Sequence, residues 1–284
     1  MKLFKAISSG TRRTLTASRQ IIIIWLITIT MISILVVPFR NLVIEEIGSG
    51  MTPEMLKHGI DISFFLSFGH SMNGLLSSFS VGLVLLIGVG FLTFVFLNGG
   101  LFDNLRVSTT SYSVRDFFSA SARLFFPFLW VNILVILIIV ASALLLIGAP
   151  VAILNIAGAE EAKIQLVIKI ARILFFVILI TYLLVVDYAR AWLAASEKRN
   201  VFKAVGYGFK ATYSSFVSSM IFMIFAVALQ ALLTWGGTKL IVGFDPASGG
   251  GLFILFLMSQ VFIILRLFFR AYRYAGVTSL YALG

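Results

Sequence analysis

Six apolar runs, each close to twenty residues long and almost free of charge, constrain the fold of this chain more than any other feature of its sequence. A helix rises about 1.5 Å per residue, so a run of about 20 residues crosses the roughly 30 Å hydrocarbon core of a bilayer. The fourth run carries Lys169 and Arg172 at one end, where long basic side chains reach the headgroups. The runs predict an all-α, polytopic membrane protein with six transmembrane helices at about 20–39, 75–98, 127–149, 164–186, 214–238 and 251–270.

Composition supports this fold class. Apolar residues make up 60% of the 284 residues and charged residues 12%, whereas a soluble domain has about 45–50% and about 25%. The formal net charge is +11, but the basic residues border the apolar runs and form no separate basic domain, which argues against nucleic-acid binding. The chain has no cysteine, so disulfides and a thiol nucleophile are excluded.

The distribution of Lys and Arg among the connections predicts the orientation in the membrane. Sixteen of the 22 lie in the N-terminal segment and in the segments 103–123, 190–210 and 266–273, and the other six lie on the opposite side. Basic residues accumulate on the cytoplasmic side of a membrane. We therefore expect a multi-pass protein of the cell inner (cytoplasmic) membrane with both termini in the cytoplasm.

Three connections on the expected cytoplasmic side are amphipathic. The segments 3–19, 114–125 and 200–213 mix apolar and basic residues at helical spacing, which is typical of helices that lie in the membrane interface. Each runs directly into an apolar run, so each is expected to form an elbow. On the opposite side, the apolar residues at 60–70 predict a short interfacial helix or a re-entrant piece within the long connection 40–73.

The elbows indicate an internal repeat. Phe-Lys-Ala-Ile at 4–7 is nearly identical to Phe-Lys-Ala-Val at 202–205. A shift of 84 residues places Asp103 on Asp187 and brings further charged and aromatic residues onto counterparts. The predicted unit is elbow, helix, helix, and the alternative explanation is chance similarity between apolar helices of low complexity. The single transmembrane domain, 1–284, then consists of three units at approximately 1–106, 107–190 and 191–284.

Two acidic residues stand where even-numbered runs leave the membrane, and each is followed three residues later by an arginine. The pairs are Asp103–Arg106 and Asp187–Arg190. Residues at i and i+3 share a helix face, so each pair can form an ion pair. One interpretation is a charged ring on the cytoplasmic face that binds a partner or gates a path. The other, which needs no ligand, is a water-exposed ion pair that anchors the helix end.

The sixth run departs from this pattern, because it carries three arginines and no aspartate. Arg266, Arg270 and Arg273, at i, i+4 and i+7, form one basic stripe on the expected helix. Such a stripe could hold anionic lipid headgroups. The alternative is an anchor of the kind that the positive-inside rule describes.

Small residues cluster in the second run, which ends at Gly99-Gly100. Small residues spaced four apart allow neighbouring helices to approach closely. We interpret them as packing positions rather than as the lining of a substrate path.

No catalytic, cofactor-binding or metal-binding residues are predicted. Apart from the fourth run, the apolar runs lack the ionisable groups that ion-coupled transporters place at mid-depth. No Ser–His or paired-Asp arrangement lies at depth either. The two histidines, His58 and His70, lack the spacing of a metal site, although a ligand role for either stays open. These features indicate a chain that is not an enzyme.

The sequence Asp-Tyr-Ala-Arg at 187–190, followed by the elbow at 202–205, carries a family resemblance. It resembles uncharacterised bacterial multi-pass domains related to the membrane domain of glycerophosphodiester phosphodiesterases, which are similar in having Asp-x-Ala-Arg before an amphipathic elbow. The resemblance extends over nearly the whole chain and implies a membrane module of unknown role. The phosphodiesterase catalytic domain is not in this sequence, so the resemblance does not imply that activity.

Two functions fit these features. The first is a non-enzymatic integral membrane subunit or scaffold that packs against other membrane proteins, against copies of itself and against lipids, anionic ones in particular. The second is a transporter or channel for a lipid or another amphipathic substrate, with a path between the three units. A polar cavity between the units would favour transport, and a closed centre would favour the scaffold.

Overall fold

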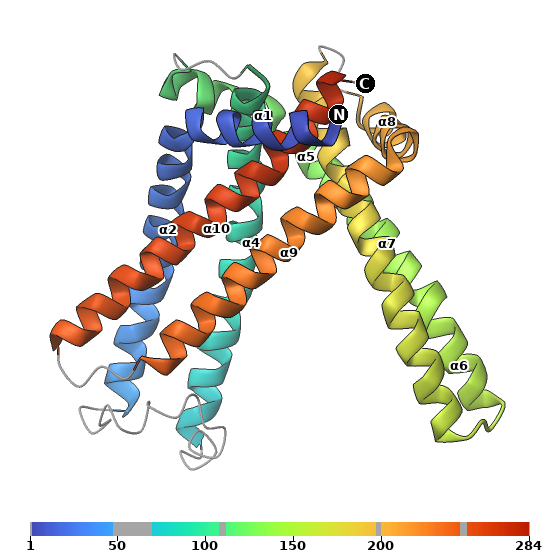
Figure 1. Ribbon diagram of the computed structural model, residues 1–284. Coiled ribbons are helices and arrows are strands. Elements are labelled where there is room, and N and C mark those ends of the chain that lie inside the picture. The colour runs from blue at the N-terminus through green and yellow to red at the C-terminus, as the bar shows by residue number, and fades with distance from the viewer. Residues whose placement is uncertain (1, 48–69, 108–111, 197–199, 245–248, 284) are drawn as a thin grey trace. The chain divides into compact units, whose positions relative to one another are not determined.

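The computed structural model describes residues 2–47, 70–107, 112–196, 200–244 and 249–283. Within these ranges the chain is almost entirely helical and contains no strand (Figure 1). The chain divides into two compact units, one of Met1–Ile22 with Val95–Gly284 and one of Ile23–Phe94. The helix or re-entrant piece predicted at 60–70, and His58, lie outside the described residues.

The described residues form the following helices. Most continue for 28 residues or more, and one turn of π-helix, η2, joins α5 to α6. Their bounds are α1 Lys2–Thr16, α2 Ser18–Ile47, α4 His70–Val107, α5 Val114–Ala143, η2 Leu144–Gly148, α6 Ala149–Ile156, α7 Glu161–Ala195, α8 Val201–Ser214, α9 Phe216–Gly243 and α10 Gly249–Leu283.

The apolar runs are helical, as expected. Among the described residues, five helices are long and apolar enough to cross a membrane, or six if α1 and the start of α2 count as one broken span. The prediction of an all-α multi-pass membrane protein is confirmed at this level. The orientation in the membrane and the threefold repeat stay predictions.

Local sequence explains where several helices begin. Ser113 caps α5: its hydroxyl accepts a hydrogen bond from the backbone N–H of Asp116 at 3.1 Å, and the Asp116 carboxylate accepts one from the Ser113 N–H at 3.2 Å. This reciprocal arrangement satisfies two backbone donors that a helix start leaves free. Asn200 caps α8 through one hydrogen bond, which its side-chain oxygen accepts from the backbone N–H of Lys203 at 3.1 Å.

Helices α5, η2 and α6 together run antiparallel to α7 (Figure 1). The turn between α6 and α7 passes through Gly158, whose φ of 65° lies in the left-handed region that glycine adopts without steric cost. Along the pair, the hydroxyls of Ser142 and Tyr182 lie 2.8 Å apart and share a hydrogen bond. Both helices present many exposed apolar side chains, as expected for surfaces that contact lipid or another protein.

The larger unit has its core where α7, α9 and α10 meet. Ten consecutive residues of α10, 271–280, are buried on all sides, which distinguishes the end of this helix from its exposed beginning. Around them packs a cluster of large buried side chains: Ile180, Leu184, Tyr188, Phe222, Met223, Tyr272, Val277 and Leu280. The end of α10 is therefore the centre of this unit rather than a surface span.

The three amphipathic segments differ in how they join the spanning helices. A single residue, Ser215, separates α8 from α9, and a single residue, Ala17, separates α1 from α2. The middle segment, 114–125, has no such break, because it is the first part of the continuous helix α5. Pro127 lies just beyond it, and a proline inside a helix removes one backbone hydrogen bond and bends the helix without ending it.

Each amphipathic segment lies against the end of a different long helix, and glycine allows the contact in each case. Gly10 of α1 faces Gly276 of α10, and a Cβ atom placed on Gly10 would lie 3.4 Å from the Gly276 nitrogen. On α8, a Cβ at Gly208 would collide with the carbonyl oxygen of Val185 in α7. These two helices therefore cross others at nearly backbone contact.

In the third contact, the glycine lies on the long helix α4 rather than on the amphipathic segment. A Cβ atom on Gly100 of α4 would lie 2.5 Å from the carbonyl oxygen of Phe117 and 2.5 Å from the Ser121 hydroxyl in α5. A Cβ atom on Gly99 would lie 3.1 Å from the Leu124 Cβ and 3.2 Å from the Ser121 Cα, which is tight but less close than at Gly100. The interpretation as packing positions is confirmed for Gly99 and Gly100, but it is wrong for Gly82 and Gly88 of the same run, where an added Cβ atom would meet nothing within 4 Å.

The smaller unit consists of the parts of α2 and α4 within 23–94. Met31 lies against Gly90, where an added Cβ atom would be 3.6 Å from the Met31 Cε. Side chains such as Ile34, Val84 and Ile87 are largely exposed. This unit is thus a pair of helices with apolar exteriors, as expected of segments that face lipid.

Candidate functional site: two carboxylates that each pair with two arginines

Asp103 and Asp187 lie near the ends of α4 and α7, and each pairs with the arginine three residues later. In each case a second arginine, from another helix, pairs with the same carboxylate: Arg123 with Asp103, and Arg273 with Asp187. The structure therefore contains two centres of one carboxylate and two guanidinium groups. All of these residues belong to the larger unit.

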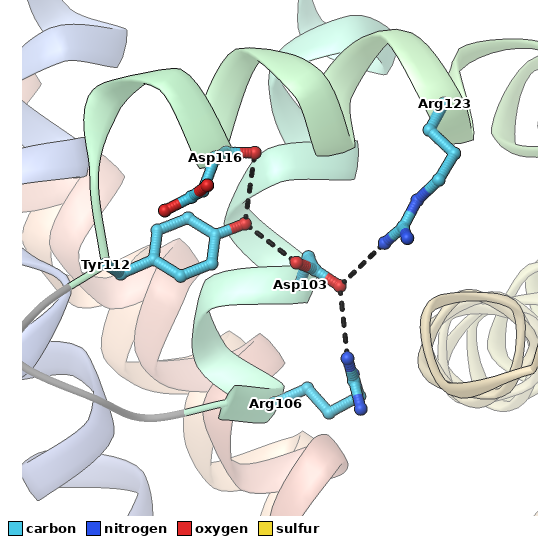
Figure 2. Close-up of polar contacts among 5 residues, drawn as sticks. All are labelled: Asp103, Arg106, Tyr112, Asp116 and Arg123. Atoms are coloured by element: carbon cyan, nitrogen blue, oxygen red, sulfur yellow. Dashed lines mark hydrogen bonds and ion pairs between the residues drawn. The ribbon is translucent and has the colours of Figure 1, made fainter.

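The arginines of the Asp103 centre are partly exposed to solvent, and Figure 2 shows both of them pointing toward the Asp103 carboxylate. The Nη2 atoms of Arg106 and Arg123 lie 3.4 Å and 3.1 Å from the same oxygen, Oδ1 of Asp103. The other oxygen, Oδ2, accepts a 2.8 Å hydrogen bond from the Tyr112 hydroxyl. The Asp103 side chain is 10% exposed, whereas those of Arg106 and Arg123 are 43% and 46% exposed.

Tyr112 is held in place by the start of α5. It immediately precedes the Ser113 cap, and the Asp116 carboxylate that completes the cap points away from Asp103 in Figure 2. Burial, and then the hydrogen bond to Asp103, raise the pKa of Tyr112 well above its usual value. The hydroxyl therefore stays protonated through the physiological pH range and remains a donor to Asp103.

The Asp187 centre is closed to solvent. Arg190 Nη1 donates a 3.2 Å hydrogen bond to Oδ1 of Asp187, and Arg273 Nε lies 3.0 Å from Oδ2. Arg190 also donates through Nη2 to the side-chain oxygen of Asn132 in α5, at 2.5 Å. The Asp187 side chain is only 1% exposed, and both arginine side chains are 11% exposed. One carboxylate thus faces two buried guanidinium groups.

An aromatic pair connects the two centres. The guanidinium carbons of Arg273 and Arg190 lie 5.0 Å and 6.0 Å from the centre of the Tyr274 ring, at cation–π distance. The ring of Phe102, the residue before Asp103, lies 4.5 Å from the same Tyr274 ring. The ends of α4, α7 and α10 therefore meet around Tyr274.

The interpretation of both pairs as water-exposed anchors needs correction. Asp187 and Arg190 are buried, because α10 covers them with Arg273 and Tyr274. At the other centre, Arg106 is exposed but its partner Asp103 is buried.

The three arginines of the basic stripe on α10 have different surroundings. Arg273 is buried against Asp187, whereas Arg266 is exposed and its Nε donates to the Thr234 hydroxyl of α9 at 3.3 Å. Arg270 is partly buried between them. The helical spacing of the three arginines is confirmed, but tertiary packing gives them different surroundings.

Sequence reasoning missed half of each centre. It did not single out Arg123 or Tyr112 as partners of Asp103, nor Asn132 as a partner of Arg190. Asn132 carried a signal, because it is an amide within an otherwise apolar run and a buried amide needs hydrogen-bond partners. The pairing of Arg273 with Asp187 joins residues 86 positions apart, and no local pattern indicates it.

Comparisons with protein-family models, curated proteins and solved structures give no match for this chain. Among the described residues, no three His, Asp or Glu side chains cluster as metal ligands would. The chemistry of the two centres must therefore be judged from their geometry. In each centre the carboxylate contacts guanidinium groups from two different helices. It is well suited to join helix ends.

Proposed function

We propose that this protein is a non-enzymatic integral membrane subunit or scaffold that packs against partner membrane proteins and lipid. The observation that carries the proposal is the Asp187 centre, where the charged groups at the meeting point of three helices are buried and engaged with one another. Such a centre joins helices and leaves little room for a polar path. The exposed apolar surfaces of the long helices supply the area for lipid and partners.

The test is purification of the whole chain in mild detergent after crosslinking in cells, with mass spectrometry of the proteins that co-purify. A scaffold should bring down a membrane protein, or further copies of itself, in near-stoichiometric amount. A chain that purifies alone and moves a labelled amphipathic lipid between the leaflets of a vesicle would support the transport function and contradict the scaffold.

We also propose that both termini face the cytoplasm of a cell with the chain in its inner membrane. The proposal predicts opposite labelling at the two ends of α7, because one span separates them. In this cysteine-free chain, a Glu160→Cys variant should react with an impermeant thiol reagent in intact cells, and a Lys203→Cys variant should react only after lysis. Both side chains are exposed, so burial does not protect either. The reverse pattern would invert the topology.

We infer that the three predicted units are structural copies, with the middle amphipathic segment merged into the continuous helix α5. Matching 4–7 with 202–205 places Gly10 on Gly208 and Thr14 on Thr212. Both threonines are fully buried, and each donates its hydroxyl to the carbonyl of the matched glycine at 2.8 Å. These equivalent contacts support common ancestry of the first and third elbows.

We further propose a relationship to the membrane domains associated with glycerophosphodiester phosphodiesterases. The motif behind that resemblance, Asp-Tyr-Ala-Arg at 187–190, supplies two of the three charges of the buried centre. A structural role for the motif would explain its presence in a membrane module that carries out no chemistry.

A further inference from the structure

A small hollow opens beside the Asp103 centre. It has a volume of about 340 Å³ and is lined by Arg106 of α4, by Arg123 and Leu124 of α5, and by residues 193–196 at the end of α7. All of these residues belong to the larger unit. The hollow is therefore a concave surface with two guanidinium groups on one side and the apolar end of a helix on the other.

The two arginines retain hydrogen-bonding capacity toward the hollow. Each contacts Asp103 through one terminal nitrogen, Nη2, whereas a guanidinium group has five N–H donors. Among the described residues, no second carboxylate forms an ion pair with either arginine. Two positive charges against one negative charge leave this centre with a net charge of +1.

The hollow lies at the ends of two candidate membrane spans. Arg106 is the last residue of the apolar stretch of α4, and residues 193–195 are the last of the apolar helix α7. Helices that cross the roughly 30 Å hydrocarbon core continue into the headgroup regions, which together with the core are about 40–45 Å thick, and we place the hollow in one of these regions. A phosphate is thus the anion most abundant at this position, and arginine binds phosphate oxygens through two parallel N–H donors.

We propose that Arg106 and Arg123 form a binding site for the phosphate group of an anionic phospholipid. The guanidinium groups hold the phosphate, and the apolar wall at 193–195 lies against the glycerol and the first acyl carbons. Asp103 orients both arginines and also competes with the phosphate for them. The site deepens the proposed function, because it rests on the placement of the chain in a membrane, and it does not depend on the identity of any partner protein.

The test is native mass spectrometry of the full-length protein in detergent, titrated with phosphatidylglycerol or with phosphatidylcholine. We expect the wild type to retain one phosphatidylglycerol in preference to phosphatidylcholine. The double variant Arg106→Gln, Arg123→Gln should bind phosphatidylglycerol at least tenfold more weakly. The matched control is Arg115→Gln, which removes an arginine of α5 that does not line the hollow and should stay within twofold of the wild type.

Inorganic phosphate, added as a competitor, distinguishes a site for free phosphate from a site that requires the phosphate group of a lipid. Competition by millimolar phosphate would show that the site binds phosphate itself, and binding of phosphatidylglycerol without competition would show that the lipid is required; both support the site. Unchanged affinity in the double variant would overturn it, as would an equal loss in Arg115→Gln. The two arginines could instead bind an acidic protein. If the double variant no longer co-purified with such a protein but still bound phosphatidylglycerol like the wild type, the lipid site would be overturned.

The substitution Asp103→Asn should change the affinity for phosphatidylglycerol in the opposite direction from the double variant. It removes the competing carboxylate and raises the net charge of the centre to +2, so the affinity for phosphatidylglycerol should increase severalfold. A decrease in a variant that elutes and melts like the wild type would contradict the proposal. If the double variant fails to fold because Asp103 loses both partners, the triple variant Asp103→Asn, Arg106→Gln, Arg123→Gln removes that charge and allows the same measurement.

Discussion

Replacing Asp187 by asparagine should lower the free energy of unfolding by about 3–5 kcal/mol, the range found when one partner of a buried ion pair is removed. The substitution keeps the size of the side chain but leaves Arg190 and Arg273 as two buried positive charges with no carboxylate. The Tyr274 ring makes a cation–π contact with each of these arginines, but such a contact is too weak to replace a buried negative charge.

The measurement is thermal or denaturant unfolding in detergent, and Asp103→Asn is the matched control. Asp103 also pairs with two arginines, but these are nearly half exposed and can be hydrated by water when the carboxylate is lost. Exposed pairs contribute about 0–1 kcal/mol, so the control should lose about 1 kcal/mol or less. Equal losses in the two variants would mean that the Asp187 centre is as accessible to water as the Asp103 centre.

A second variant tests whether the stability lost in Asp187→Asn comes from unpaired charge or from lost packing. Adding Arg273→Met to Asp187→Asn removes one of the two stranded charges and keeps an unbranched apolar chain in its place. The double variant should therefore be more stable than Asp187→Asn alone. If it is less stable, the two substitutions act independently and the loss does not come from charge.

Replacing Gly208 by alanine should lower the free energy of unfolding by about 1–3 kcal/mol, the usual cost of inserting a methyl group where no space exists. The new methyl group would collide with the carbonyl oxygen of Val185. A backbone atom within α7 cannot rotate away as the tip of a side chain can. Helix α8 would have to move away from α7 along its whole length.

The same helix supplies the control, two residues away. Gly206 is exposed, and a Cβ atom there would meet no other atom within 4 Å. Alanine is favoured over glycine in a helix by about 0.8–1.0 kcal/mol, so Gly206→Ala should stabilise the protein slightly. Opposite signs for the two substitutions in an unfolding measurement would support the close contact, and a stabilising Gly208→Ala would contradict it.

The substitution Gly10→Ala applies the same test to α1, the first amphipathic segment. A Cβ atom at this position would lie 3.4 Å from the Gly276 nitrogen, a separation that is tight but allows a small adjustment. Gly10→Ala should therefore cost less than Gly208→Ala. A cost as large as that of Gly208→Ala would mean that α1 and α10 are packed as closely as α8 and α7.

Several features of this protein follow from its sequence alone because they depend on local patterns. Apolar runs about as long as a bilayer is thick predict spanning helices, and the helices occur where the runs are. The Asp-x-x-Arg spacing predicts that each aspartate meets the next arginine on its own helix face, and both pairs form. A helix has a fixed rise and turn, so contacts within three or four residues can be read directly from the sequence.

Tertiary structure alone decided which of these charges are buried. Asp103-Arg106 and Asp187-Arg190 look equivalent as sequences, yet one centre opens to solvent and the other is covered by the end of α10. The same packing turns Arg273 inward and leaves Arg266 outside, although both lie on one predicted stripe. The physical reason is that burial depends on which helix packs against a given face, and that choice joins residues far apart in the chain.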